Sequence, residues 1–428
     1  MRIACFWAVL AAACRLASAQ LPVDSQLAAE ISKIRAIDNH AHPVRPTFGN
    51  DKDLDFDALP VEAMEPSTDP VRTRPGSPLA LEASQALFGQ AKDFRARKRQ
   101  LVAEKGVGYA NWVLNQLGIE TMLANRVVMG PGLAPPRFLW VPFEDALMYP
   151  LNNTGLAARN SDRKAFFADE DRLLQRYLKE CGYIDPPASF DDYLKKVVTA
   201  TLERHKSGGA VAVKFEAAYL RSLQFDDPSH AEAARVYSAS RRAAPSDASY
   251  KQLQDYIFRY IAAECGRLDL PVHLHSAAGG GGYFNVAGAN PLGLESVLND
   301  PKLRKTNFVM VHGGWPFTRE VAALLSKPNA YTDFSEQTFS NYPRAVAGAI
   351  REWLEYAPEK VMFATDAYPF SEEMGWEEAG WVAGTTGRQA LGFALTEMMH
   401  DGEITRARAL EIARLVLRDN ARKLYHLK

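Results

Sequence analysis

Short apolar runs recur along the chain from residue 33 onward, and segments with helical spacing lie between them. Several runs are apolar throughout rather than alternating, among them Val211–Val213, Phe308–Val311 and Val361–Ala364. Continuous apolarity indicates strands that are buried on both faces, as in a parallel sheet covered by helices. The runs that we expect to form strands are Ile34–His40, Ile119–Met129, Phe138–Phe143, Ala210–Phe215, Leu270–His275, Asn307–His312, Ala330–Phe334 and Lys360–Asp366.

Helical spacing is clearest between the last five runs, in Tyr250–Glu264, Thr318–Ser326 and Tyr342–Tyr356. Strands that alternate with helices indicate βαβ units and a parallel sheet. Eight such strands predict an α/β fold of the (β/α)8 or TIM barrel class. Two long connections, about 50–118 and 153–206, interrupt the alternation and have mainly helical patterns. We expect both to be insertions over the barrel mouth.

The N-terminus has the pattern of a cleavable signal peptide. Arg2 precedes the apolar run Ile3–Cys14, and Ala17-Ser18-Ala19 supplies a small-residue cleavage site before Gln20. We therefore expect residues 1–19 to be removed, residues 20–428 to form a single barrel domain, and the protein to be secreted or periplasmic.

Composition narrows the classes of function. The 428 residues have a formal net charge of -1, and no long run of either charge stands out, which argues against nucleic-acid binding. No later stretch is apolar for eighteen residues, so we expect no membrane span. We expect a small-molecule substrate, and homo-oligomers are common among such barrels. Cys181 and Cys265 remain after cleavage, and we interpret them as unpaired thiols, with a disulfide as the alternative.

Metal-ligand residue types stand at the ends of predicted strands. His40 and His42 end the first strand two positions apart, so both imidazoles point to one face. His275, His312 and Asp366 each follow an apolar run directly. The carboxyl ends of barrel strands converge on one mouth, where active sites are found. Imidazole and carboxylate together suit zinc and similar divalent ions.

These motifs resemble the amidohydrolase superfamily, in its amidohydrolase-related family 2. The resemblance is nearest to the domain fused to some glutamine-synthetase-like proteins and more distant to uronate isomerase. It covers most of residues 33–425 and is thin between 50 and 118. The matching segments are His40–His42, Val213–Arg221, Val272–His275, Val311–Glu320, Asn329–Ser335 and Phe363–Asp366.

The resemblance implies a role for each strand-end residue. His40, His42 and His275 would bind a metal ion, and Asp366 would be a further ligand or the group that takes a proton from water. His312 would bind a second ion or act as an acid or base toward the substrate. The expected cofactor is one or two divalent ions, with zinc expected first and manganese or another divalent ion as alternatives.

Other candidate residues have open roles. Lys214 would be a carboxylated ligand that bridges two ions, a bare cation for a substrate carboxylate, or a lysine with its amine in solvent. Arg126, Tyr219 and Arg221 are candidate substrate contacts because arginine suits carboxylates, and Trp315 would wall the pocket. His273 shares the face of His275, and we expect it to support the structure rather than bind metal.

The leading hypothesis is a metal-dependent hydrolase that cleaves a C–N or C–O bond, in an amide, lactone or related ester, of a small carboxylate-bearing molecule. A divalent ion would lower the pKa of bound water and polarise the carbonyl. The alternatives are a metal-dependent non-oxidative decarboxylase, a sugar-acid isomerase, and a non-enzymatic binding protein that keeps the barrel.

Overall fold

The computed structural model describes residues 21–59, 69–74, 76–159, 161–240 and 244–428. The predicted signal peptide, residues 1–19, lies outside this part. Eight parallel strands follow one another in the order of the predicted runs. They are β1 (Ala36–Ala41), β2 (Ile119–Asn125), β3 (Phe138–Val141), β4 (Val213–Phe215), β5 (Val272–His275), β6 (Phe308–Val311), β7 (Ala330–Asp333) and β8 (Val361–Met362).

The strands form two sheets, β1-β2-β3 and β4-β5-β6-β7-β8, and backbone contacts join the sheets at both seams. Between β3 and β4, the Lys214 amide donates to the Pro142 carbonyl at 2.7 Å. Between β8 and β1, the Asn39 amide donates to the Phe363 carbonyl at 3.0 Å and the Asp366 amide to the His40 carbonyl at 2.8 Å. The predicted TIM barrel is therefore confirmed.

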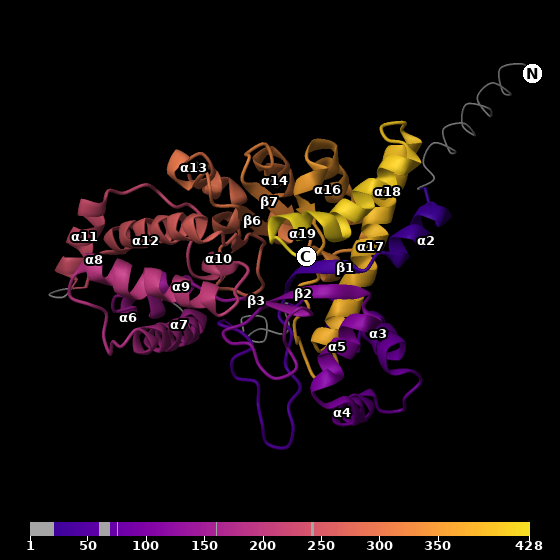
Figure 1. Cartoon of the computed structure of the whole chain (residues 1–428), viewed down its shortest axis with the longest axis horizontal. Coiled ribbons are helices and arrows are strands. Elements are labelled where there is room, and N and C mark those ends of the chain that lie inside the picture. Colours follow the sequence, from indigo (N-terminus) through magenta and orange to yellow (C-terminus); the bar gives the residue numbers. More distant parts are fainter. Residues whose placement is uncertain (1–20, 60–68, 75, 160, 241–243) are drawn as a thin grey trace, which may run out of the picture.

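Helices cover the outside of the strands (Figure 1). In α16 (Pro343–Tyr356) the buried residues include Val346, Ala347, Ile350 and Trp353, which repeat at the spacing of one helix face. That face packs toward the barrel core, so the apolar period places this helix. The other helices after β4 are α10 (Ala217–Leu220), α11 (His230–Ala239), α12 (Asp247–Leu268), α13 (Glu295–Leu298), α14 (Thr318–Leu324), α15 (Gln337–Ser340), α17 (Trp376–His400), α18 (Arg406–Arg414) and α19 (Asn420–Leu424).

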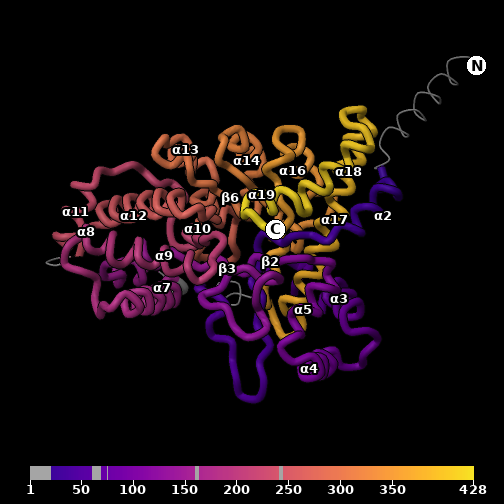
Figure 2. Tube along the Cα trace, in the orientation of Figure 1, coloured from indigo at the N-terminus to yellow at the C-terminus, as the bar shows by residue number. Residues whose placement is uncertain are grey.

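The first helix of the described residues is α2 (Ser25–Lys33), and two helical insertions follow later in the chain (Figure 2). The first contains α3 (Pro78–Phe88), α4 (Phe94–Lys105) and α5 (Tyr109–Gln116). The second contains α6 (Thr154–Ala157), α7 (Ser161–Glu180), α8 (Phe190–Asp192) and α9 (Ala200–Ser207). In the first insertion, Asp69 and Pro70 line a pocket over Asp366, which we call the main pocket. In the second insertion, Phe166 contacts Tyr283, which lines the same pocket, with ring centroids 4.8 Å apart.

The C-terminus packs into the barrel interior beside β1 (Figure 1). The Tyr425 hydroxyl donates to Oδ1 of Asn39 at 2.5 Å and lies 2.7 Å from Nε2 of His273. Asn39 directly precedes His40 on β1, and His273 lies two positions before His275 on β5. This contact agrees with the supporting role expected for His273.

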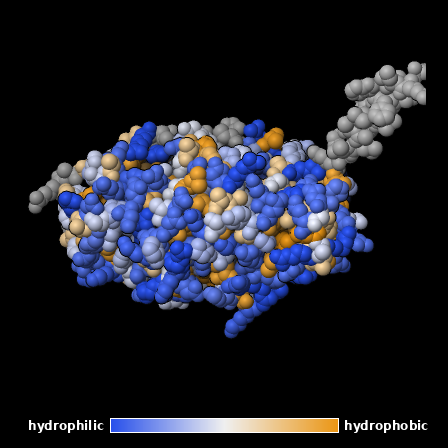
Figure 3. Space-filling view, turned by 90° about the horizontal axis from the view of Figure 1, so that it is seen from above, coloured by the Kyte–Doolittle hydropathy of each residue, from blue (hydrophilic) through white to orange (hydrophobic). Residues whose placement is uncertain are grey.

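The surface is that of an ordinary globular chain. On the face in Figure 3, hydrophilic side chains predominate and hydrophobic ones are scattered among them. Within the described residues, no helix combines the length and apolar character needed to cross a membrane. Cys181 and Cys265 are both free thiols, as interpreted from the sequence.

Candidate active site

Predicted ligands from opposite sides of the barrel meet at its mouth. Nε2 of His40 lies 3.1 Å from Oδ1 of Asp366, 3.3 Å from Nε2 of His42 and 3.3 Å from Nζ of Lys214. His42 and Asp366 are themselves 3.6 Å apart at these atoms. His40, His42 and Asp366 are buried and offer one donor atom each within 4.8 Å of one another, a spacing that suits one ion.

A second donor group adjoins the first. His275, His312 and Glu336 also place one donor atom each within 4.8 Å of one another. The ring of His312 lies 4.6 Å from that of His275 and 5.0 Å from that of His40, measured between centroids. These two groups adjoin at the mouth, with Lys214 beside the first, and a third group of the same spacing, His42, Asp57 and Glu216, overlaps the first at His42.

Three of these residues have an unusual backbone conformation. His312, Glu336 and Asp366 have φ values of 71°, 57° and 53°, in the left-handed region that residues other than glycine rarely adopt. Each follows the end of a strand, β6, β7 or β8. Strained conformations of this kind cluster at functional sites, where the surrounding structure maintains them.

Burial keeps the histidines neutral. It lowers the pKa of His40, His275 and His312 well below 6.5, and the nearby Lys214 ammonium lowers each further. Metal ligands must be deprotonated, so neutral imidazoles are ready donors. A set of imidazole nitrogens and carboxylate oxygens fits zinc or a related divalent ion.

The hydrogen bonds around His312 define which of its nitrogens carries the proton. The Ser335 hydroxyl donates to Oδ1 of Asp333 at 2.6 Å, so its only hydrogen is used there. Nδ1 of His312 lies 2.9 Å from the same hydroxyl oxygen and must donate to it. In the neutral ring, Nε2 of His312 then has a free lone pair.

Asp333 is well supported as the acceptor. It also receives hydrogen bonds from the backbone amides of His312 and Ser335, at 3.0 and 3.1 Å, and from Nδ2 of Asn39 at 2.7 Å. Burial raises the pKa of Asp333, and the Ser335 bond opposes that rise. Four donors aimed at one carboxyl group favour the carboxylate.

Several site residues were absent from the sequence-based prediction. Glu336 and Ser335 follow β7 in the same way that Asp366 follows β8, and this position was the signal that could have identified them. Asp57 lies in the first insertion, with Oδ2 3.2 Å from Nδ1 of His42, although the two groups are not aligned as a hydrogen bond. Nothing local in the sequence indicates this contact.

The two arginines predicted to bind substrate lie elsewhere. Both Nη atoms of Arg126 contact the Asp53 carboxylate, at 2.8 and 2.7 Å, and Nη1 also donates to the Pro43 carbonyl. Arg221 pairs with Asp255 at 2.5 Å and donates to the Gln224 carbonyl. Neither arginine lines the main pocket. The structure thus places both in its scaffold.

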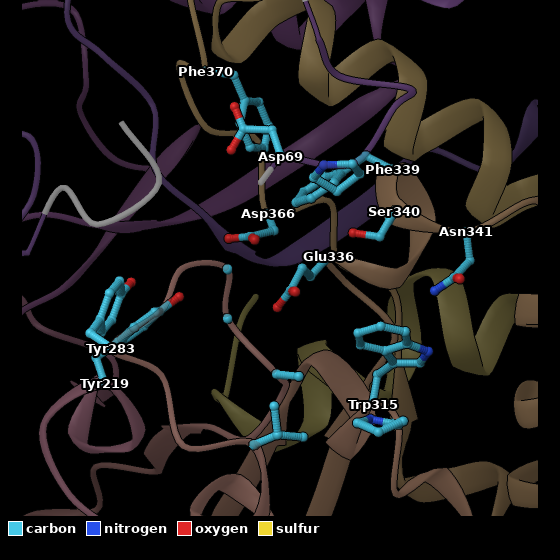
Figure 4. A pocket seen from close by; sticks show the side chains of 16 residues that line it. Asp69, Tyr219, Tyr283, Trp315, Glu336, Phe339, Ser340, Asn341, Asp366 and Phe370 are labelled. Carbon is cyan, nitrogen blue, oxygen red and sulfur yellow. The ribbon is translucent and has the colours of Figure 1, made fainter. Parts of the chain in front are cut away.

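Tyr219 and Trp315 do line the pocket, which opens over Asp366 and has a volume of about 520 Å³ (Figure 4). The ring of Tyr219 packs 4.4 Å from that of His275, between centroids. Trp315 is 36% exposed and stands on the opposite side from Tyr219. Gly279 and Gly280, from the glycine run 279–282, form part of the wall. The pocket therefore connects solvent to the two donor groups.

The fold and the site together define a TIM barrel with a cluster of metal-donor side chains at the strand ends. The chain belongs to the amidohydrolase family, whose model matches residues 37–427. It is 29% identical to Protein fluG of Emericella nidulans over 185 residues, which are 41% of this chain and 20% of that protein. The chain thus spans about a fifth of the length of this curated relative.

Solved structures share the fold at low sequence identity. A Lactobacillus casei protein described as a metal-dependent hydrolase is 18% identical, with a TM-score of 0.66, over 94% of this chain and 97% of that chain. Glucuronate isomerase from Caulobacter crescentus is 13% identical, with a TM-score of 0.63, over 94% and 93%. Uronate isomerase from Thermotoga maritima is 12% identical, with a TM-score of 0.60, over 94% and 96%. At these identities the likeness shows the fold alone.

Proposed function

We propose that this protein is a metal-dependent hydrolase that cleaves the C–N or C–O bond of an amide, lactone or related ester. The observation that carries the proposal is the position of Asp366. Its carboxylate contacts His40 and His42 in the first donor group and also lines the pocket. A group placed in this way can exchange a proton between water and a substrate that occupies the pocket.

His40 and His42 would hold an ion together with Asp366, while His275, His312 and Glu336 would hold a second. When bound, a divalent ion lowers the pKa of coordinated water and polarises a carbonyl. Asp366 would then accept the proton from water and deliver it to the leaving group. Because Nδ1 of His312 donates to Ser335, His312 would serve as a ligand or hydrogen-bond acceptor rather than as the acid.

The chemical state of Lys214 affects how many divalent ions the donor groups can hold. Its Nζ lies 3.3 Å from Nε2 of His40, and a bare ammonium there would repel a divalent ion bound by His40. Carboxylation would remove this repulsion and supply oxygen ligands instead. We therefore infer a carboxylated Lys214 and two ions. The expected result is two equivalents of metal in the wild type and fewer in Lys214→Ala, measured by elemental analysis.

The test of function is turnover with and without metal. Protein loaded with zinc or manganese is screened against amides, lactones and esters, then stripped with a chelator and reloaded. Stripping should abolish turnover and reloading should restore it. His40→Ala should lose activity by several orders of magnitude, whereas the matched control His230→Ala, an exposed histidine on α11, should keep it. Full activity in the stripped protein, or in His40→Ala, would refute the proposal.

The same screen separates hydrolysis from decarboxylation. Carboxylated aromatic compounds are included, and carbon dioxide release is measured directly. If carbon dioxide is released and no amide, lactone or ester is hydrolysed, the proposed hydrolase function is wrong and the protein is a metal-dependent decarboxylase. Interconversion of a sugar acid, followed by chromatography, would identify an isomerase instead.

A further inference from the structure

The wall of the main pocket is acidic and aromatic. Its described lining residues include three carboxylates, those of Asp69, Glu336 and Asp366, and no arginine or lysine. The arginines that would have received a carboxylate, Arg126 and Arg221, are engaged elsewhere.

Asp69 is the carboxylate in this pocket that the metal-donor groups leave unused. Asp69 is 9% exposed, and Figure 4 shows its side chain at the pocket beside Phe370. Within the described residues, its carboxylate has no hydrogen bond or ion pair. Burying an unpaired carboxylate is costly, so a partner of opposite charge would be stabilising.

Two arginines hold the segment around Asp69 in place, and the charge of Arg74 partly offsets that of the Asp69 carboxylate by lowering its pKa against the effect of burial. Nε of Arg74 donates to the backbone carbonyl of Asp69 at 2.8 Å. The Arg72 guanidinium donates to the carbonyls of Thr338 and Asn341 and to the Thr386 hydroxyl, which anchors the segment against α15 and α17. Two arginines thus fix the position of Asp69, yet neither forms an ion pair with its side chain.

Aromatic rings complete the wall. Phe339 and Phe370 contact each other at 5.0 Å between centroids on the side of Asp69, and Trp315 and Tyr219 face the same space (Figure 4). Ring faces attract cations and exclude water, which strengthens an ion pair made among them. A carboxylate framed by aromatic rings is a recognition site for an organic cation.

We propose that the substrate carries an ammonium or guanidinium group that binds Asp69 among these rings while its scissile bond lies over Asp366. This inference rests on the proposed function, because it takes the pocket to be the substrate site. It adds the chemical class of the substrate. A carboxylate-bearing substrate would instead find the like charge of Asp69 and no arginine or lysine among the described residues of the wall, since Glu336 and Asp366 belong to the donor groups. The substrate class predicted here is therefore a cationic amide or ester, such as an amide of a basic amine or amino acid.

Binding is tested first, because it needs no turnover. Metal-loaded full-length protein is titrated calorimetrically at pH 7.5 with 2-phenylethylammonium and with its neutral analogue 2-phenylethanol. Burial raises the pKa of Asp69 to about 6, so the carboxylate is charged at this pH. The ammonium should bind about tenfold more tightly than the alcohol, the effect expected of one ion pair with cation–π contacts.

Asp69→Asn should bring the two affinities close together. The matched control is Asp185→Asn, which removes an exposed carboxylate outside the pocket and should keep the tenfold ratio. Equal affinities in the wild type, including no measurable binding of either probe, would overturn the inference. So would an Asp69→Asn variant that keeps the ratio.

Turnover distinguishes this inference from the proposed function. The p-nitroanilides of Nα-acetyl-lysine and Nα-acetyl-norleucine differ only by the side-chain ammonium group. The kcat/KM should favour the lysine compound about tenfold in the wild type and not in Asp69→Asn. If no amide or ester is hydrolysed but the ammonium still binds selectively, the proposed function fails and the cation site stands. If hydrolysis occurs with no preference for the cation in kinetics or binding, only the cation site fails.

Discussion

The Ser335 hydroxyl offers a sharp test of how the site is built. It joins Nδ1 of His312, at 2.9 Å, to Oδ1 of Asp333, at 2.6 Å, and the residue is fully buried. Ser335→Ala removes the acceptor that holds the His312 proton on Nδ1. A hydrogen bond to a charged group contributes about 1.5–3 kcal/mol, and each 1.36 kcal/mol corresponds to a factor of ten. We therefore expect kcat to fall roughly 10- to 100-fold.

The matched control is Ser276→Ala. Ser276 is also fully buried and follows His275 at the end of β5, but its hydroxyl donates to the Val311 carbonyl at 2.7 Å and not to a histidine ring. In urea titrations, Ser276→Ala should lose about 1 kcal/mol of unfolding free energy, and Ser335→Ala about 1.5–3 kcal/mol because its hydroxyl bonds to a charged group. Only Ser335→Ala should lose turnover on the best substrate of the screen, and its metal affinity, measured by chelator competition, should weaken about 10- to 100-fold.

Two results would refute this reasoning. One is a Ser335→Ala enzyme whose kcat and metal affinity stay within twofold of the wild type. The other is an equal loss of kcat in Ser276→Ala, because that would attribute the effect to general destabilisation of the strand ends.

Two stability predictions concern groups outside the donor clusters. Burial raises the pKa of Asp145 from 3.8 to about 7. Between pH 3.8 and pH 7 the folded state therefore holds a proton that the unfolded chain releases. The free energy of unfolding falls as the pH rises through this range. Asp145→Asn should therefore raise the unfolding free energy at pH 8, on the order of 2 kcal/mol, and change it little near pH 4, as urea titrations at both pH values would show. Arg126→Met should lower it by about 1.5–3 kcal/mol in the same assay, because the buried Asp53 carboxylate would lose its two bonds to Arg126 and keep only Arg45, whose Nε lies 3.6 Å away, as a charged partner. The first prediction would be contradicted if Asp145→Asn changed the unfolding free energy equally at pH 4 and pH 8. The second would be contradicted if Arg126→Met left the urea midpoint unchanged.

The sequence determined the barrel and the ligands of the first donor group. Uninterrupted apolar runs such as Phe308–Val311 and Val361–Ala364 are buried on both faces wherever a parallel sheet is covered by helices, so local composition was sufficient. Asp366 stands at the end of such a run, and His40 and His42 end the first predicted strand. The carboxyl ends of parallel strands share one edge, so their convergence needed no knowledge of distant contacts.

The tertiary structure alone decided the roles of the charged side chains. Arg126 and Arg221 follow strands β2 and β4 just as a substrate-binding arginine would, but Asp53 and Asp255, from segments distant in the chain, pair with them. An ion pair depends on which segments fold together, and that is not a local property of the sequence.

The tertiary structure likewise decided which side chains line the substrate pocket. Glu336 reaches the second donor group through a left-handed backbone that no propensity favours. Asp69 faces the pocket because Arg72 anchors its segment to α15 and α17. The sequence thus determined where a metal could bind, because strand ends converge in every barrel. Which charges meet the substrate was decided by long-range packing, which here left the pocket acidic and aromatic.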